Sequence, residues 1–218
     1  MIFFKYYSLI KESKMWYFFK LNIALIIFIF LLLNPSITHA QEKAKKPIFS
    51  IGVKVGPTFT GISSNNYKTK SGLYYAILLS NEIYMSDSFS LEIGIGSHNS
   101  KFTSGGYEYS MSYVTTPILL KYYFTSHAKS YGIWAGLGFE PRYKSFAKGF
   151  GGTVNVMSAT EGGLFAIGGS YKTSENISVV FDLRYYMGLS KAFETDIDKN
   201  KGYLREFTFY AGVAYTIF

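Results

Sequence analysis

The chain has 218 residues, of which only 17% are charged, compared with about 25% in a typical soluble domain. Tyrosine and phenylalanine are abundant, which favours strands over helices, while the absence of cysteine excludes disulfide bonds, thiolate metal sites and cysteine-based catalysis. The formal net charge is +8 without any run of five basic residues, so the charge points to anionic lipid headgroups and not to nucleic acid.

Residues 1–40 have the three parts of a secretory signal peptide. Basic residues precede an apolar run over residues 21–33, and Thr38-His39-Ala40 supplies small residues at the positions that a signal peptidase reads. The apolar run is short for a membrane-spanning helix, which needs roughly 20 residues, so an uncleaved anchor helix is the weaker alternative. We expect cleavage after Ala40 and a short periplasmic segment over residues 41–47.

From residue 48 onwards, apolar and polar residues alternate with a period of two, which is the pattern of strands with two different faces. The alternation is strong in five segments, at residues 48–60, 89–96, 132–140, 177–189 and 207–217. Three weaker segments, at residues 72–84, 109–124 and 159–172, raise the expected number of strands to eight.

The predicted connections alternate between short and long. The short ones lie around Ser86-Asp87, Ser126–Lys129 and Ser174-Glu175, and the long ones cover residues 61–71, 102–108, 144–158 and 191–202. Outer-membrane barrels have an even number of antiparallel strands, short periplasmic turns and longer external loops. The expected fold is therefore all-β, an eight-stranded antiparallel up-and-down transmembrane β-barrel over residues 48–218, in the outer membrane with both termini periplasmic.

The polar face of the predicted strands carries charges among many glycines. Because side chains fill the interior of an eight-stranded barrel, we expect these charges to neutralise one another as a structural network in the lumen. They are Lys54, Glu82, Glu92, Lys121, Glu140, Arg142, Asp182, Arg184 and Glu206. Arg184 is diagonal to Glu206 in the last predicted hairpin, so these two side chains are expected to meet. Tyrosines near strand ends, which membranes favour at headgroup depth, are Tyr84, Tyr143 and Tyr203.

One arrangement of residues raises the alternative of an enzyme. His98 lies beside Ser97 and Ser100 near the predicted outer rim, and Glu108 follows in the adjoining loop. A Ser-His-Glu set could act as a lipid-modifying hydrolase, provided that nucleophile and base meet at hydrogen-bond distance. Solvated side chains at a loop mouth are the more ordinary interpretation, and no catalytic residue, cofactor site or metal site is assigned.

Four segments resemble the small porin-like outer-membrane β-barrel family common in the Bacteroidetes, which includes PorT-like proteins. They are Tyr113 to Phe124 with its central proline, Ser90 to Gly94, Leu183 to Leu189, and Ala211 to Phe218. The positions that match the family's motifs are Pro117, Arg184, Tyr185, Gly188, Leu189 and Phe218. The resemblance covers essentially residues 48–218 and implies an outer-membrane barrel.

The leading functional hypothesis is a non-enzymatic barrel with a structural, adhesive or envelope-assembly accessory role and a lumen filled by side chains. A narrow porin-like pore for small solutes is the second hypothesis, and a lipid-modifying enzyme is the third. The expected partners are outer-membrane lipid and lipopolysaccharide, the barrel-assembly machinery during insertion, and a protein of the cell envelope.

Overall fold

The computed structural model describes residues 48–63, 69–104, 107–125, 130–148, 154–195 and 201–218. All of them belong to one compact unit, Lys43–Phe218. The predicted signal peptide and the segment 41–47 lie outside the described residues. Within the described ranges, no helix is long and apolar enough to cross a membrane.

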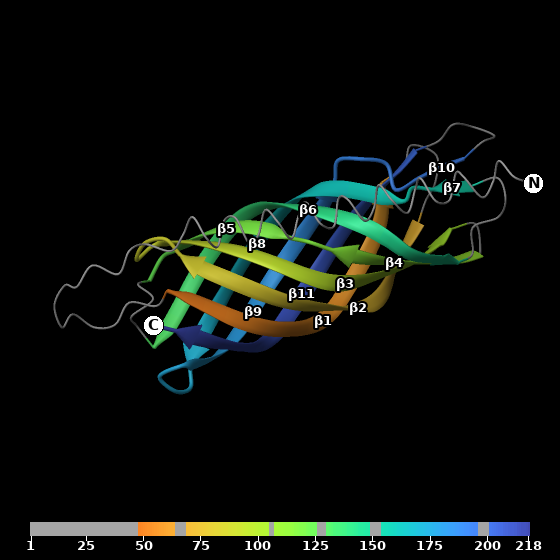
Figure 1. Ribbon diagram of the computed structural model, residues 1–218. Helices are drawn as coiled ribbons and strands as arrows, with labels where there is room; N and C mark the ends of the chain where they lie inside the picture. The colour runs from red at the N-terminus through yellow and green to blue at the C-terminus, as the bar shows by residue number, and fades with distance from the viewer. Residues whose placement is uncertain (1–47, 64–68, 105–106, 126–129, 149–153, 196–200) are drawn as a thin grey trace, which may run out of the picture. The chain divides into compact units, whose positions relative to one another are not determined.

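Antiparallel strands form one sheet whose two ends meet (Figure 1). The strands are β1 (Phe49–Ser63), β2 (Thr69–Tyr84), β3 (Phe89–Ser104), β4 (Tyr107–Thr115), β5 (Ile118–Tyr123), β6 (Tyr131–Lys148), β7 (Val154–Val156), β8 (Ala159–Lys172), β9 (Ile177–Gly188), β10 (Phe193–Thr195) and β11 (Lys201–Ile217). The long strands follow the order β1-β2-β3-β4-β6-β8-β9-β11, and β1 also pairs with β11. The prediction of an all-β antiparallel architecture is therefore confirmed.

The span predicted at residues 109–124 is divided at Pro117. Strands β4 and β5 lie between the same neighbours, β3 and β6, so together they form one interrupted span. Proline has no N–H to donate to a neighbouring strand. Its carbonyl still accepts a hydrogen bond of 2.9 Å from the backbone N–H of Gly94, and the preceding Thr116 donates to Pro141 at 3.1 Å. The described residues thus contain eight spans, one of them broken.

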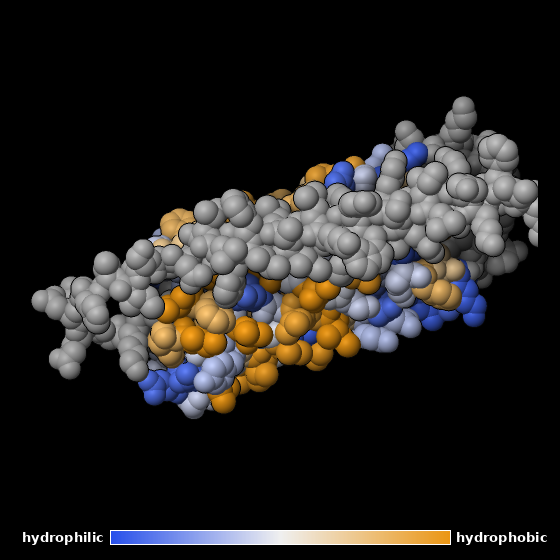
Figure 2. Space-filling model, in the orientation of Figure 1, coloured by the Kyte–Doolittle hydropathy of each residue, from blue (hydrophilic) through white to orange (hydrophobic). Residues whose placement is uncertain are grey.

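The strands turn their two faces to different surroundings. In β1, Ile51, Val53 and Val55 are about half exposed, whereas Lys54 between them is only 4% exposed. Exposed apolar side chains recur on the outer face of the other long strands, and Figure 2 shows them as orange residues across the middle of the visible face. The alternation in the sequence therefore separates an apolar exterior from a polar interior.

The two ends of the sheet differ in their connections. At one end, which we call the turn end, residues 85–88, 124–130 and 173–176 join β2 to β3, β5 to β6 and β8 to β9. The opposite end, the loop end, carries the remaining connections. The short strands β7 and β10 pair there with each other, and β10 also pairs with the start of β11.

The predicted long loop at residues 102–108 is wrong. Strand β3 continues to Ser104 and β4 starts at Tyr107, which leaves residues 105–106 as the connection. An ion pair of 2.8 Å joins Lys101 to Glu108 across this hairpin, and the rings of Phe102 and Tyr109 stack at 5.1 Å. The predicted loops 144–158 and 191–202 are also too long, because β6 extends to Lys148 and both segments contain a short strand.

Candidate functional site

Each of the nine charged residues predicted for the lumen lies in the interior of the sheet. None is more than 8% exposed, and Arg142 and Glu206 are completely buried. A buried charge is costly unless it is paired and hydrogen-bonded, so the contacts of these side chains determine what the interior can do. The charges divide into two groups along the interior.

The group nearer the turn end has three cations and three carboxylates, and we call it the turn-end cluster. Its members are Lys54, Glu82, Glu92, Lys121, Asp182 and Arg184. Glu92 is its centre, because its two oxygens contact Lys54 at 2.8 Å, Lys121 at 2.7 Å and Arg184 at 2.6 Å. These contacts connect four spans of the sheet, and the cluster as a whole is electrically neutral.

The remaining carboxylates of the turn-end cluster are also satisfied. Asp182 accepts hydrogen bonds from Lys54 at 2.8 Å and from Arg184 at 2.9 Å. Glu82 accepts from Lys121 at 2.7 Å, from the Tyr123 hydroxyl at 2.6 Å and from Ser90 at 2.5 Å. Each acid therefore has several donors, as expected for a structural network of buried charges.

The second group lies towards the loop end and consists of Glu140, Arg142 and Glu206, which we call the loop-end cluster. The Arg142 Nε donates to Glu140 at 2.7 Å, and its Nη1 forms an ion pair with Glu206. The guanidinium also lies over the ring of Tyr186, 3.5 Å from its centroid. Thr60 donates to Glu206 at 2.9 Å, so the carboxylate is held from more than one strand.

The expected contact between Arg184 and Glu206 is wrong. Arg184 is opposite Thr208 in the β9–β11 register, so Glu206 is indeed in the diagonal position. The guanidinium nevertheless binds Asp182 on its own strand and Glu92 across the interior. Sequence reasoning missed this partner because contacts across a lumen depend on strand tilt and not on hairpin register.

The Ser-His-Glu arrangement is not present. His98 Nε2 lies 2.6 Å from the hydroxyl of Tyr210, and its Nδ1 lies 3.6 Å from Glu206. Ser100 donates its hydroxyl to Glu206, while Ser97 is exposed on the outer face. Glu108 is 63% exposed and paired with Lys101. Within the described residues, neither Ser97 nor Ser100 forms a hydrogen bond with His98, so the set lacks a nucleophile with its base.

An apolar layer fills the interior at the loop end, which the sequence analysis did not anticipate. Buried side chains in it include Ile62, Phe102, Met111, Leu204 and Phe193. Phe193 comes from β10 and stacks on Phe102 with ring centroids 6.3 Å apart. A Cβ added to Gly202 would lie 2.3 Å from the Phe193 ring, so glycine leaves the space that this ring fills. Aromatic residues at inward-facing positions of the strands are the feature of the sequence from which this layer could have been predicted.

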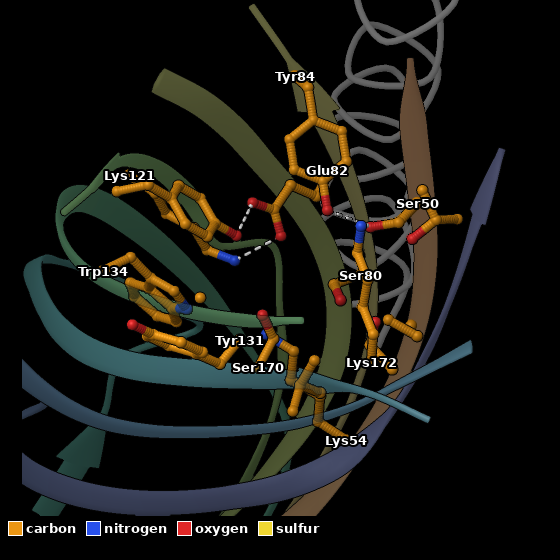
Figure 3. A pocket seen from close by; sticks show the side chains of 17 residues that line it. Ser50, Lys54, Ser80, Glu82, Tyr84, Lys121, Tyr131, Trp134, Ser170 and Lys172 are labelled. Atoms are coloured by element: carbon orange, nitrogen blue, oxygen red, sulfur yellow. Dashed lines mark hydrogen bonds and ion pairs between the residues drawn. The ribbon is translucent and has the colours of Figure 1, made fainter. Parts of the chain in front are cut away.

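The interior at the turn end is hollow where the loop end is filled. A cavity of about 40 Å³ lies there, room for about three water molecules. We call it the turn-end cup. Figure 3 shows Lys54, Ser80, Ser170 and Lys172 around this space, with Lys121 and Glu82 joined by an ion pair at one side. Tyr84, predicted at headgroup depth, also lines the cup, so its side chain faces the interior and does not face the lipid.

The family model of the outer membrane protein beta-barrel domain matches residues 27–216. The chain belongs to this family. No curated protein matches it. The chain is similar to the crystal structure of the outer membrane protein OprG from Pseudomonas aeruginosa, with 14% identity, coverage of 78% of this chain and 97% of OprG, and a TM-score of 0.58. It is also similar to the solid-state NMR structure of outer membrane protein AlkL in DMPC lipid bilayers, with 13% identity, coverage of 83% and 96%, and a TM-score of 0.50. At these identities the two structures support the fold.

Membership of an outer-membrane barrel family explains the apolar exterior, which lipid tails solvate. Two of the family-motif positions, Tyr185 and Leu189, lie on this exterior, and Tyr185 packs on Phe207 with ring centroids 4.6 Å apart. Gly188 allows the close approach of β11, because a Cβ there would lie 2.9 Å from the Leu204 carbonyl oxygen. Phe218 lies beside Lys172, whose ammonium is 5.9 Å from its ring.

Among the described residues, no group of three or more His, Asp or Glu side chains could hold a metal ion. The other two tyrosines predicted at headgroup depth, Tyr143 and Tyr203, are half-buried near the loop end. His127 and the rest of the turn 126–129 lie outside the described residues.

Proposed function

We propose that this outer-membrane barrel is a non-enzymatic, non-conducting component of the envelope. Its strands anchor it in the lipid, and its loop end offers a surface for an adhesive or accessory contact. The observation that carries the proposal is the sequence of layers in the lumen, where two clusters of paired charges are followed by a packed apolar layer. Solutes would have to displace buried ion pairs and aromatic rings in order to pass.

The energetics of the lumen support the closed state. Removing one partner of a buried ion pair costs about 3–5 kcal/mol of stability. Every carboxylate of the turn-end cluster contacts at least two cationic or hydroxyl donors, so opening the lumen would break several such contacts. A narrow pore, the second hypothesis, would need charges that face water and remain free to exchange partners. The Arg142 guanidinium, held against Tyr186 and two carboxylates, does not meet that requirement.

The proposed orientation has the turn end in the periplasm and the loop end outside the cell. In bacterial barrels the longer connections are external, and the two longest connections of this chain, between β6 and β8 and between β9 and β11, are at the loop end. The backbone N–H of Ile48 donates to Ile217 at 2.9 Å, so both ends of the barrel domain lie at the turn end and are periplasmic in this orientation.

We further propose removal of residues 1–40 as a signal peptide, insertion by the barrel-assembly machinery, contact with lipopolysaccharide, and membership of the porin-like group that includes PorT-like proteins.

Planar-bilayer recording tests the closed lumen directly. Purified protein should produce no stepwise conductance under conditions in which a known porin conducts. Stepwise currents that change in the Arg184→Met variant would overturn the proposal and establish the lumen as an ion path. If no conductance is found, purification from envelopes after cross-linking at the loop end identifies the partner of the non-conducting barrel.

A further inference from the structure

The turn-end cup has hydroxyl groups that the protein itself does not satisfy. Ser80 and Ser178 are 5% and 7% exposed, and Ser170 is partly buried beside them. None of the three hydroxyls makes a hydrogen bond within the described part of the chain, whereas the nearby Ser90 donates to Glu82. Their side chains line the open space of the cup, so their hydroxyl groups can form hydrogen bonds with water or with a ligand there.

Charge in the cup is not balanced. The turn-end cluster beneath it is neutral, because Lys54, Lys121 and Arg184 match three carboxylates. Lys172 also lines the cup, and none of the described carboxylates lies within ion-pair distance of its ammonium. The cup is therefore lined by one lysine that has no ion pair with the described residues and by three serine hydroxyl groups, of which Figure 3 labels Ser80 and Ser170.

Small residues create this space. The inward positions around the cup include Gly52, Gly132 and Ala214, where the equivalent layer at the loop end has Phe102, Met111 and Leu204. A Cβ on Gly132 would lie 2.7 Å from the hydroxyl oxygen of Ser170, so a larger residue there would close the cup against this serine. The hollow is thus built by several strands and is not a gap between two loops.

We propose that the turn-end cup binds a carboxylate group, with the Lys172 ammonium as counter-ion and the hydroxyls of Ser80, Ser170 and Ser178 as donors. A carboxylate carries the single negative charge that balances Lys172, and its few atoms suit a volume of about 40 Å³. Hydrogen bonds from hydroxyl and ammonium donors to an ionised acceptor are the strong class of such bonds. The floor of paired charges and the apolar layer beyond it make the cup a closed end, so the ligand enters and leaves by the turn end. This assignment does not depend on which side of the membrane that end faces.

The test is an NMR titration of the full mature chain in detergent micelles with sodium acetate, against sodium chloride at equal ionic strength. We expect saturable shifts of the backbone amides of Ser80, Ser170 and Ser178 with acetate only. Lys172→Gln should weaken acetate binding by about tenfold, as expected for the loss of a charged hydrogen-bond donor. Lys148→Gln, at an exposed lysine of the loop end, is the matched control and should bind as the parent does. Heat-modifiable migration on gels verifies that each variant is folded.

Titration with peptides distinguishes two sources of the carboxylate, a polypeptide chain end and a small free acid. Binding of a tripeptide with a free C-terminal carboxylate identifies a chain end as the ligand, and binding of acetate alone identifies a small free acid. The assignment fails if acetate produces no saturable shifts, if the amidated tripeptide binds as well as the free acid, or if Lys148→Gln weakens binding as much as Lys172→Gln. Ser80→Ala combined with Ser178→Ala provides a second variant that keeps Lys172, and unchanged acetate affinity in it would also overturn the proposal.

Discussion

Arg184 on β9 and Glu92 on β3 meet across the interior of the barrel, with the guanidinium Nη2 2.6 Å from the carboxylate Oε1. The two residues are 92 positions apart in the chain and belong to strands that are not neighbours in the sheet. The same guanidinium binds Asp182, so one side chain pairs with two acids that are only 1% and 2% exposed. Stability and closure of the lumen therefore depend on the same contact.

Replacement of Arg184 by Met should destabilise the barrel by about 3–5 kcal/mol, because Glu92 and Asp182 lose a buried cationic partner. Urea unfolding in detergent micelles measures the change. Arg205→Met is the control, since Arg205 is exposed on the outer face and has no ion pair with the described residues. Equal losses in both variants would mean that the buried contact contributes nothing specific.

Replacement of Phe102 by Ala should cost about 3–5 kcal/mol, because it removes a ring that is 2% exposed and leaves a cavity between Tyr109 and Phe193. Phe209 is 47% exposed on the lipid face, where lipid tails refill the space. Its replacement by Ala should cost only the transfer term, about 1.5–3 kcal/mol. Unfolding midpoints of the two variants compare them, and a smaller loss for Phe102→Ala would contradict the packed loop-end layer.

Single cysteines report the orientation, since the natural chain has none. Lys148→Cys lies at the loop end and Glu175→Cys lies in the turn between β8 and β9, and both positions are exposed. A membrane-impermeant maleimide applied to intact cells should label the first and reach the second only after the outer membrane is permeabilised. The reverse pattern would show an inverted barrel.

Replacement of His98 by Ala should leave the lipid A profile unchanged in mass spectra of whole envelopes. The imidazole is occupied by Tyr210 and Glu206, and neither Ser97 nor Ser100 is its partner. A lipid species that disappears in the variant and returns with the parent gene would establish a catalytic role. The variant's unfolding midpoint, measured in parallel, excludes loss of the fold as the cause.

Whether a residue faces the lumen or the lipid could be read from the sequence. Successive side chains of a strand point to opposite faces, so the alternation around Lys54 or Arg184 specifies two environments without knowledge of any partner strand. The even number of spans followed from counting such segments. The ends of these segments could not be predicted from the sequence. The β3–β4 hairpin continues beyond the point where its outer residues become polar, and an ion pair between Lys101 and Glu108 stabilises it there.

Only the tertiary structure decided which charges meet. Hairpin register put Glu206 diagonal to Arg184, but the two side chains bind Arg142 and Glu92 respectively. Side chains that fill a lumen meet partners from strands on the far side, and their relative height depends on the tilt and stagger of the whole closed sheet. These quantities belong to all the strands together. The period-two pattern of one strand therefore determines the face on which a charge lies, and closure of the sheet determines its partner.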